Sequence, residues 1–413
     1  MNRKDLFVYF DHRSDTAPHP LGVLSAQMIR GKELFSFAFD EDFLKRRSFF
    51  SLDPDLQFYA GPQFTSKSNF GLFMDSAPDR WGRKLIQRRE AVRAKHAGER
   101  PKTLTESDYL LGVYDETRMG ALRFKSSPDG EFRNNDRLMA APPWTSLREL
   151  EAACRHFERE DDVDDHAKWI SMLVAPGSSL GGARPKANVC DTEGNLWIAK
   201  FPSHHDDSNV AAWEYAVMLM ARDAGLNVPE CRLEKFSQYG STFLVKRFDR
   251  ERKKRIHFAS AMTLLGKTDG ANAENGSSYL ELAQLLTRYG SKPQDDLPEL
   301  WRRIAFSVAV SNTDDHLRNH GFLLSNQGWR LSPAYDLNPN PDGMGLSLNI
   351  SDIDNALDFD LVMEVAPMFR LSANEAGKML KQIRSTVEQF NSYARRAGLS
   401  QREQERMRTA FRF

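Results

Sequence analysis

Acidic and amide side chains gather in one stretch near the end of the chain, between Asn312 and Asp336. Asn319 follows Asp314 by five residues, and Asp336 comes after a run with the pattern of a β-hairpin. Carboxylate and amide oxygens suit Mg²⁺, which takes few protein ligands when phosphate oxygens and water supply the rest. A remaining carboxylate can orient or deprotonate an attacking hydroxyl, as in the catalytic loop of a kinase. The spacing therefore indicates phosphoryl transfer, with Asp314 as the base and Asn319 and Asp336 as metal ligands.

Two other interpretations of this stretch compete with the first. Asp, Asn and His residues also decorate ordinary turns, although a match at three positions around a hairpin weakens that interpretation. His316 and His320 are four residues apart and would form a zinc pair if they lay on one helix face. Gly321 and the turn-forming residues before it argue against a regular helix there.

The sequence around this stretch indicates which elements hold it. An apolar helical run between Leu300 and Ala309 stops at Ser311, where side chains that compete for backbone hydrogen bonds begin. The loop that carries Asp314 is therefore predicted to be exposed. After it, residues 322–324 and 329–331 are predicted strands joined by a tight turn.

A second informative stretch, residues 175–189, is rich in glycine and serine. Backbone N–H groups can approach an anion closely in such a loop, and Arg184 and Lys186 add positive charge. It is neither a Walker A loop nor a GxGxxG loop. Two strands are predicted after it, over 187–190 and 196–201, and Lys200 lies in the second. A strand lysine behind a flexible phosphate loop is the arrangement that holds ATP phosphates in kinases.

Glu214 lies on a predicted helix that begins after Ser208 and ends at Gly225. In a kinase it would pair with Lys200; otherwise it is a solvated helix residue. The two alternatives are equally supported by the sequence.

Basic residues are concentrated in two runs. Residues 79–94 form a predicted basic helix, and residues 249–255, DRERKKR, a predicted exposed loop. We favour a solvated surface over a nucleic-acid-binding arm for both runs. Elsewhere, aromatic runs in the first 124 residues predict a small sheet, and residues 233–236 and 241–248 predict a strand pair.

The whole chain has 413 residues, which favours two or three domains. Its 57 basic and 57 acidic residues give no net charge, so the overall charge does not indicate binding to nucleic acid. The three cysteines are widely spaced and predict neither a disulfide framework nor a zinc knuckle. No apolar leader or membrane-length run is present in the sequence, so we expect a soluble cytoplasmic protein with no membrane partner.

Six short motifs occur in order along the chain: FMDSAPDRWGR, SSLGGARPK, IAK, VKRFDR, NTDDHLRN and PAYD. Together they resemble the HipA family of bacterial serine/threonine kinases, over nearly the whole chain. The resemblance implies an α+β, protein-kinase-like fold of the HipA type, with an N-terminal α/β domain and a mainly helical C-terminal lobe. We divide the chain accordingly into an N-terminal domain (1–139), a nucleotide-loop region (140–260) and a helical lobe with the catalytic loop (261–413).

The resemblance also implies roles for individual residues. Asp314 would be the catalytic base, Asn319 and Asp336 would bind Mg²⁺, and Lys200 would hold the phosphates of ATP. Ser179, or its neighbour Ser178, would be autophosphorylated and shut the enzyme down. The remaining nucleotide-binding positions would be Leu180, Gly181, Gly182, Ala183, Arg184, Pro185, Lys186, Lys246, Arg247, Phe248, His316, Leu317, Arg318 and Tyr335.

Partners follow from the same resemblance. They would be a helix-turn-helix antitoxin similar to HipB, operator DNA reached through the antitoxin complex, and a protein substrate such as an aminoacyl-tRNA synthetase. The chain departs from the family's best-known pattern at Arg184, Pro185 and Asp315, although no proposed chemical group is lost.

Two functions of other classes are alternatives to the kinase. One is a metal-dependent phosphohydrolase in which His204, His205 and Asp206 join Asp314 around a metal. The other is a non-catalytic protein of kinase fold that binds DNA or a partner.

Overall fold

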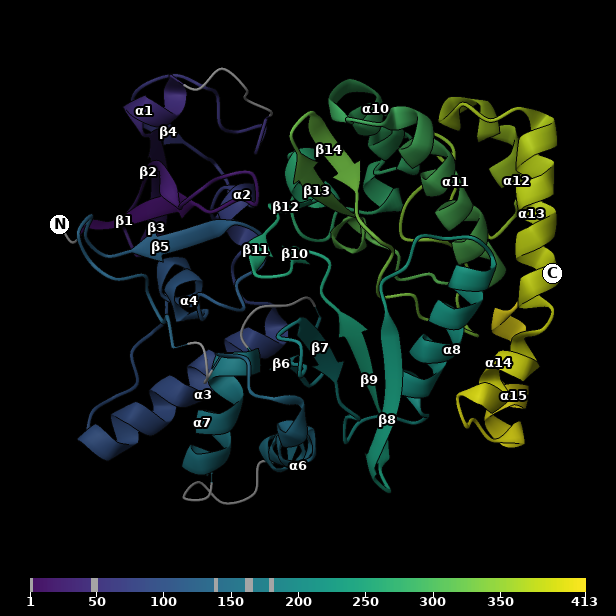
Figure 1. Ribbon diagram of the computed structural model, residues 1–413, viewed down its shortest axis with the longest axis horizontal. Helices are drawn as coiled ribbons and strands as arrows, with labels where there is room; N and C mark the ends of the chain where they lie inside the picture. Colours follow the sequence, from purple (N-terminus) through teal and green to yellow (C-terminus); the bar gives the residue numbers. More distant parts are fainter. Residues whose placement is uncertain (1–2, 46–50, 137–139, 160–165, 178–181) are drawn as a thin grey trace. The chain divides into compact units, whose positions relative to one another are not determined.

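The computed structural model describes residues 3–45, 51–136, 140–159, 166–177 and 182–413. The chain forms two compact units, which Figure 1 shows in sequence colours. Unit 1 consists of Met1–His205 and Asp249–Ala259, and unit 2 of Asp206–Phe248 and Ser260–Phe413. Both contain helices and strands, which confirms the α+β class. The three-part division expected from the sequence stays a prediction.

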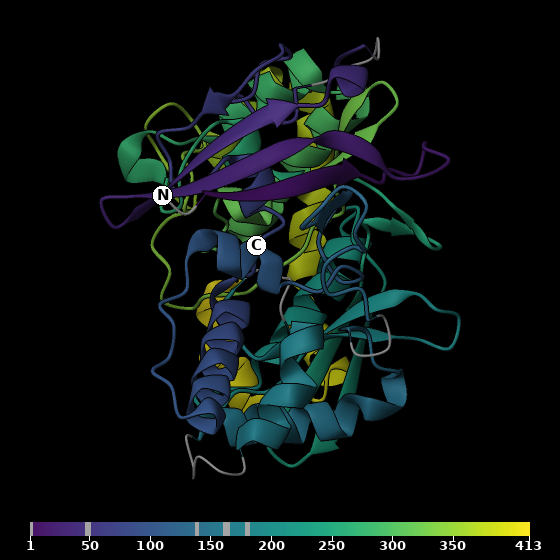
Figure 2. The same ribbon diagram turned by 90° about the vertical axis from the view of Figure 1, so that its left-hand side faces the viewer.

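A five-stranded sheet with the order β4-β3-β2-β1-β5 forms the first part of unit 1. Its long strands β1, β2 and β3 run side by side and antiparallel (Figure 2). Alternate residues of β1, among them Leu6 and Val8, are buried, as expected for a sheet with one face on a core. The predicted small sheet is therefore confirmed. Its strands are β1 (Arg3–Phe10), β2 (His19–Ile29), β3 (Lys32–Phe39), β4 (Gln63–Phe64) and β5 (Leu122–Lys125).

The basic run after the sheet forms α3 (Arg80–Ala97), as predicted. It begins at Asp79, whose side chain accepts a hydrogen bond from the Gly82 N–H, and ends at Gly98 in the left-handed region. α3 packs against α7, which packs against α6. The predicted strands after the glycine-rich stretch form the hairpin β6–β7. The remaining elements here are α1 (Glu41–Leu44), α2 (Gly71–Met74), α4 (Glu106–Gly112), η1 (Trp144–Ser146), α6 (Leu147–Glu158), α7 (His166–Gly177), β6 (Lys186–Cys190) and β7 (Leu196–Lys200).

The prediction of an exposed loop holds only for the middle of the DRERKKR segment: residues 251–254 are exposed, whereas Asp249 and Arg255 are buried. Its ends form the hairpin β10 (Arg250–Glu251) and β11 (Lys254–Arg255), and its side chains Arg250 and Arg255 are each only 7% exposed. Arg250 donates hydrogen bonds to the carbonyl oxygens of Glu116 and Arg118, at 2.9 and 2.8 Å. The segment therefore belongs to unit 1, because its cations satisfy backbone groups far away in the sequence.

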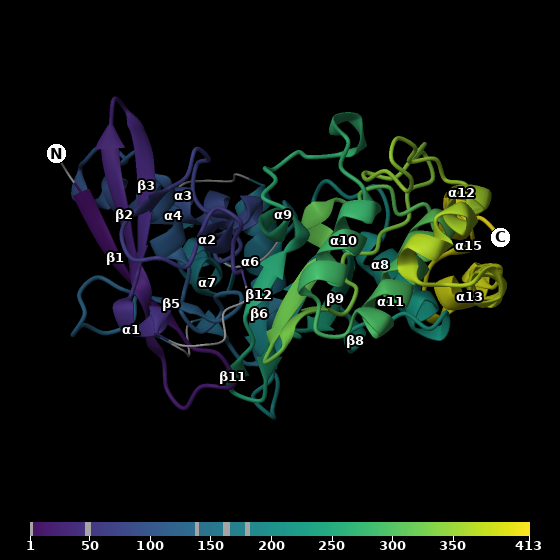
Figure 3. The same ribbon diagram turned by 90° about the horizontal axis from the view of Figure 1, so that it is seen from above.

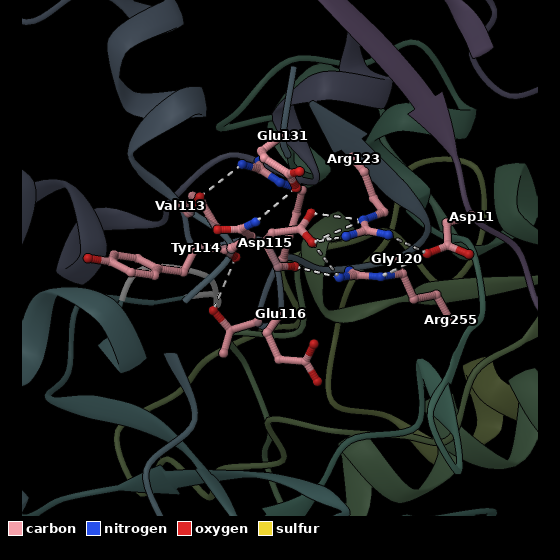
Figure 4. Close-up of polar contacts among 12 residues, drawn as sticks. Asp11, Val113, Tyr114, Asp115, Glu116, Gly120, Arg123, Glu131 and Arg255 are labelled. Carbon is pink, nitrogen blue, oxygen red and sulfur yellow. Dashed lines mark hydrogen bonds and ion pairs between the residues drawn. The ribbon is translucent and has the colours of Figure 1, made fainter. Parts of the chain in front are cut away.

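Asp115 is the centre of a buried cluster of charges in unit 1. Figure 4 shows the guanidinium groups of Arg123 and Arg255 directed at its carboxylate, with Asp11 beyond them. Arg123 Nη2 and Arg255 Nη2 lie 2.6 and 3.3 Å from Asp115 Oδ2, and Arg123 Nη1 lies 3.2 Å from Asp11 Oδ2. Burial alone would raise the pKa of Asp115, but Arg255 and Arg123 hold it below its usual value. The cluster thus joins β5, β11 and the loop after α4.

Unit 2 begins with α8 (Val210–Asp223), which packs on the antiparallel pair β8 (Cys231–Ser237) and β9 (Gly240–Lys246). The strand pair and the helix are confirmed predictions. The N-cap of α8 is Asn209, however, and not Ser208, since the Asn209 side chain accepts from the Ala212 N–H. Glu214 is only 4% exposed, so it is not a solvated helix residue.

The rest of unit 2 is mainly helical, as expected. α11 (Pro293–Ala309) contacts α10 (Tyr279–Tyr289), α12 (Phe359–Glu364) and α13 (Ala373–Val387), and lies between α10 and α13 in Figure 3. Buried residues of α11 such as Leu300, Ile304 and Val308 recur at helical spacing and form the core contact. Within the described ranges, no helix is long and apolar enough to cross a membrane. The other elements are β12 (Phe258–Ser260), α9 (Ala261–Leu264), η2 (Ala273–Asn275), η3 (Leu317–Asn319), β13 (Gly321–Ser325), β14 (Gly328–Leu331), η4 (Ala366–Phe369), α14 (Phe390–Arg396), α15 (Gln401–Met407) and η5 (Arg408–Ala410).

Candidate functional site

The acidic loop starts where α11 ends. Ser311 has a positive φ of 48°, which turns the chain out of the helix. Asn312 then donates from its backbone N–H to the carbonyl of Ser307 at 2.8 Å and accepts from the Asn338 N–H at 3.1 Å. The end of the helix is thereby tied to the segment that follows Asp336. The sequence predicted where the helix stops, and this contact fixes the direction of the loop.

Asp314 and Asn319 lie close together on this loop. The Asn319 side-chain amide donates to the backbone carbonyl of Asp314 at 2.8 Å. A carbonyl can only accept, so the amide nitrogen faces it and the amide oxygen points elsewhere. Asp314 is exposed, and within the described part of the chain its carboxylate accepts no hydrogen bond. Asn319 is only 7% exposed, and its amide oxygen has no hydrogen-bond donor among those residues. The predicted exposure of the loop is therefore confirmed for Asp314 alone among residues 311–320.

Tyr335 connects this loop to Asp336. Its hydroxyl donates to the Arg318 carbonyl at 2.6 Å, and its ring lies 5.5 Å from that of Phe248 between centroids. Residues adjacent to Asn319 and Asp336 are therefore hydrogen-bonded to each other across the hairpin β13–β14, whose register pairs Leu324 with Trp329. The predicted hairpin is confirmed.

Asp336 is half-buried and has a positive φ of 60°, which is rare for a residue with a side chain. Asn338 Nδ2 lies 3.4 Å from its Oδ1. Asp tolerates this backbone conformation better than most residues, and such conformations cluster at functional sites. The link through Tyr335 and the turn at Asp336 bring the amide and the second carboxylate into one region of unit 2.

Asp315, the residue beside the proposed base, has a different environment. It is 3% exposed, and its carboxylate accepts from the Tyr279 hydroxyl at 2.7 Å and lies 3.1 Å from His320 Nε2. Burial alone would raise the pKa of Asp315, but His320 and Tyr279 lower it. Burial and the nearby Asp315 raise the pKa of Tyr279 well above its ordinary value. These buried contacts of Asp315 with Tyr279 and His320 hold the loop in place directly after Asp314.

We expect Tyr279→Phe to lower the free energy of unfolding by about 1.5 kcal/mol, because the buried Asp315 carboxylate loses a hydrogen-bond donor. The change is measured by urea denaturation at pH 7. Tyr289→Phe on the same helix is the control, since the Tyr289 hydroxyl has no hydrogen bond within the described residues. Equal stabilities of the two variants would show that the Tyr279 hydroxyl contributes nothing.

The two histidines of the zinc interpretation have separate surroundings. His320 lies beside Asp315, whereas His316 precedes a short 3₁₀ turn and not a regular helix. Among the described residues, no group of three or more His, Cys, Asp or Glu side chains is arranged to hold a metal ion. This argues against the zinc pair and against the metal centre of His204, His205 and Asp206. The backbone N–H of His204 donates to the Glu158 carboxylate at 2.8 Å.

The nucleotide-loop residues lie in unit 1. Ser178, Ser179, Leu180 and Gly181 fall outside the described residues. Gly182 has a positive φ of 94° and Arg184 is half-buried. The predictions for these positions, and for Ala183 and Pro185, stay predictions.

Lys186 is held in a buried ion pair that the sequence analysis did not predict. Its ammonium lies 3.0 Å from Asp79 Oδ2, and both side chains are 4% exposed. The Lys186 carbonyl accepts from the Trp81 indole N–H at 3.0 Å. Asp79 therefore has two roles, since its carboxylate caps the N-terminus of α3 and also neutralises the charge of Lys186. The signal available in the sequence was the position of Asp79 inside the FMDSAPDRWGR motif.

Lys200 is the register partner of Lys186 across the β6–β7 hairpin, so both side chains leave the same face of the pair. Two like charges directly opposite each other would repel, and Asp79 offsets one of them. Lys200 belongs to unit 1 and Glu214 to unit 2, and their pairing stays a prediction.

The residues after β9 were predicted to line the adenine pocket. The backbone N–H of Lys246 donates to the carbonyl of Glu230 at 2.9 Å, and the Lys246 ammonium lies 3.6 Å from the Glu230 carboxylate. Arg247 is 4% exposed, whereas Phe248 contacts Tyr335 as described above. Leu317 is buried, with 2% of the residue exposed, and its contact with the nucleotide stays a prediction. Unit 2 thus brings together Phe248, Tyr335, Arg318, Asn319 and Asp314.

Comparison with known proteins places these motifs in context. The family model for the HipA-like C-terminal domain matches residues 178–395. A putative kinase of Sinorhizobium fredii is 31% identical over 156 residues, which are 35% of this chain and 37% of that protein. A putative kinase of Haemophilus influenzae is 29% identical over 180 residues, 39% of this chain and 52% of that protein. The serine/threonine-protein kinase toxin HipA of Shewanella oneidensis is 25% identical over 226 residues, 47% of this chain and 50% of that protein.

The chain thus spans about half the length, or less, of the curated relatives that it matches. Among solved structures, the complex of HipA, HipB and operator DNA from Shewanella oneidensis contains a similar chain. The TM-score is 0.64 at 18% identity, and the match covers 98% of this chain and 94% of that one. This likeness confirms the expected HipA-type fold.

Proposed function

The chain belongs to the HipA family, and from that premise we propose that it is an ATP- and Mg²⁺-dependent serine/threonine protein kinase. The observation that carries the proposal is the arrangement in unit 2. An exposed carboxylate, Asp314, lies beside the amide of Asn319, and the Tyr335–Arg318 hydrogen bond ties both to Asp336. A candidate base and two oxygen ligands for Mg²⁺ are among the groups that kinases use for phosphoryl transfer, and they support the proposal.

The residues present fit a magnesium ion. The amide nitrogen of Asn319 is used by the Asp314 carbonyl, so its oxygen remains as a ligand, and Asp336 supplies a carboxylate. When bound, the ion supplies positive charge that shields the phosphate oxygens.

The other steps in this proposal belong to the protein's own residues. Asp314 orients the attacking hydroxyl and accepts its proton while the hydroxyl oxygen bonds the γ-phosphorus of ATP, the bond from that phosphorus to the β–γ bridging oxygen breaks, and ADP leaves. Phe248 and Tyr335 offer an aromatic surface to the base of the nucleotide. The other residues that contact the nucleotide in this proposal are Lys246, Arg247, His316, Leu317 and Arg318. From the family resemblance alone, we propose that Lys200 and the residues from Leu180 to Lys186 hold the phosphates of ATP.

We further propose that the chain is the toxin of a two-gene toxin–antitoxin module. The support is its likeness to a HipA toxin and to the HipA chain of a complex with HipB and operator DNA. On this proposal a helix-turn-helix antitoxin similar to HipB carries the chain to operator DNA. The target is a protein, for example an aminoacyl-tRNA synthetase. Phosphorylation of Ser179, or of Ser178, switches the enzyme off.

The test is incubation of the full chain with γ-labelled ATP. We expect label on the protein that requires Mg²⁺, is removed by chelation, and maps to residues 178–179. Release of free phosphate with no labelled protein would support the phosphohydrolase instead. Absence of both, with binding to DNA or to an antitoxin retained, would support the non-catalytic alternative.

A further inference from the structure

The loop that follows Asp336 presents two large apolar side chains to solvent. Met344 is 91% exposed and Ile353 is 90% exposed, more than any other large apolar residue among those described. Single exposed apolar residues are common on protein surfaces. These two stand on one loop, between β14 and α12, and that loop is attached to the proposed catalytic residues.

The attachment runs through Thr313, the residue before Asp314. Asn340 Nδ2 donates to Thr313 Oγ1 at 2.8 Å, and Ser347 Oγ donates to the Thr313 carbonyl at 2.8 Å. Gly343 lies so close that an added Cβ would be 2.3 Å from Thr313 Cγ2. Met344 follows Gly343 directly. The backbone at Met344 is therefore held next to Thr313, the residue that precedes Asp314.

The loop is ordered by its own contacts, which keeps the exposed side chains in place. Gly345 and Ala356 form an antiparallel bridge, and the Leu346 N–H donates to the Asn355 carbonyl at 2.9 Å. Asn355 Nδ2 returns a hydrogen bond to the Leu346 carbonyl at 2.6 Å. A preformed surface loses little conformational entropy when a partner binds.

All charged residues in the segment 331–369 are acidic, although the chain as a whole has no net charge. No Lys, Arg or His occurs between Arg330 and Arg370. Asp342, Asp352 and Asp354 are exposed, and none of them has an ion-pair partner within the described residues. The acidic residues in this interval are Asp336, Asp342, Asp352, Asp354, Asp358, Asp360 and Glu364.

We propose that this surface, Met344 and Ile353 with Asp342, Asp352 and Asp354, docks the protein substrate of the kinase. The complementary partner is a segment that carries a serine or threonine near at least one large apolar side chain and several Lys or Arg residues. Nucleic acid does not fit, because its phosphates would face uncompensated carboxylates. The inference rests on the proposed kinase activity for the role of the site, but not for the binding itself.

The test uses three fluorescent peptides of equal length, each with one serine. The first carries a Phe and three Lys, the second replaces Phe with Ala, and the third replaces each Lys with Glu. Binding to the full chain is measured by fluorescence anisotropy without nucleotide, and phosphorylation separately with ATP and Mg²⁺. We expect the first peptide to bind at least tenfold more tightly than either other peptide, and to lose most of that advantage in 0.5 M salt.

Substitutions on the loop identify the surface. We expect Met344→Ser to raise Kd and KM for the first peptide about tenfold, with kcat within twofold, because the lost contact is the same in the ground and transition states. Asp342→Asn combined with Asp352→Asn should raise both values about fivefold at low salt only. The controls are Met368→Ser, which removes another exposed apolar residue, and Asp207→Asn, which removes another exposed acid.

The outcomes separate the two proposals. Equal binding of the three peptides, or wild-type Kd values for the Met344 and double Asp variants, would overturn the docking surface even in an active kinase. Selective binding of the first peptide without phosphate transfer would uphold the surface and overturn the kinase.

Discussion

Asp314→Asn is expected to slow phosphoryl transfer from ATP about a thousandfold, within the range that general-base catalysis contributes. Asn has almost the same shape but cannot accept the proton of the attacking hydroxyl. Asp314 is exposed and its carboxylate accepts no hydrogen bond within the described residues, so we expect the free energy of unfolding to change by less than about 0.5 kcal/mol. The measurement is the initial rate of label transfer at saturating ATP and Mg²⁺.

Asp207→Asn is the matched control, because Asp207 is also exposed in unit 2 and also lacks a side-chain partner among the described residues. ATP binding, followed by equilibrium dialysis, should be nearly unchanged in the Asp314 variant if the residue acts on the hydroxyl alone. A variant that kept more than a tenth of the wild-type rate would remove Asp314 from the role of base. The carboxylate of Asp336 would then be the next residue to test.

Asp115→Asn is expected to destabilise unit 1 by about 4 kcal/mol, the range found when one partner of a buried ion pair is removed. Asn keeps the shape but leaves Arg255, which is 7% exposed as a side chain, without the carboxylate 3.3 Å from it. Asp11 is then the acidic partner that both arginines share, with its Oδ2 3.2 Å from Arg123 Nη1 and 3.6 Å from Arg255 Nε. Hydrogen exchange of the β1–β3 amides reports the opening of unit 1 by itself. The exposed Asp129→Asn is the control, with an expected change within about 0.5 kcal/mol.

The effect of Asp115 should also depend on pH. Its pKa in the folded protein is lowered, so the unfolded chain binds the proton more tightly. Stability contributed by Asp115 is therefore complete above the unfolded pKa of about 3.9 and is lost as pH falls through the folded pKa. The difference between wild type and Asp115→Asn should shrink below about pH 4. A difference that grew on acidification would contradict this account.

Much of the local structure follows from the sequence, because it depends on neighbours in the chain. The aromatic run of β1, the basic helix that follows Asp79 and the tight turn before Gly328 are short-range features, and the predicted strand, helix and hairpin all formed. The spacing of Asp314 and Asn319 belongs to the same class, since a hydrogen bond within one loop holds them together.

The tertiary structure decided which charged residues are buried. Asp314 and Asp315 are neighbours with the same side chain, yet one is exposed and the other pairs with Tyr279 and His320 beneath the loop. Arg255 lies in a run that resembled a solvated surface until its partners, 140 residues earlier, were known. The cost of burying a charge is offset only by groups brought from elsewhere in the chain. A local sequence pattern does not show which distant groups will become partners of a charged residue. The sequence therefore determined the elements and the motifs, whereas only the tertiary structure decided which charged side chains are buried and with which partners.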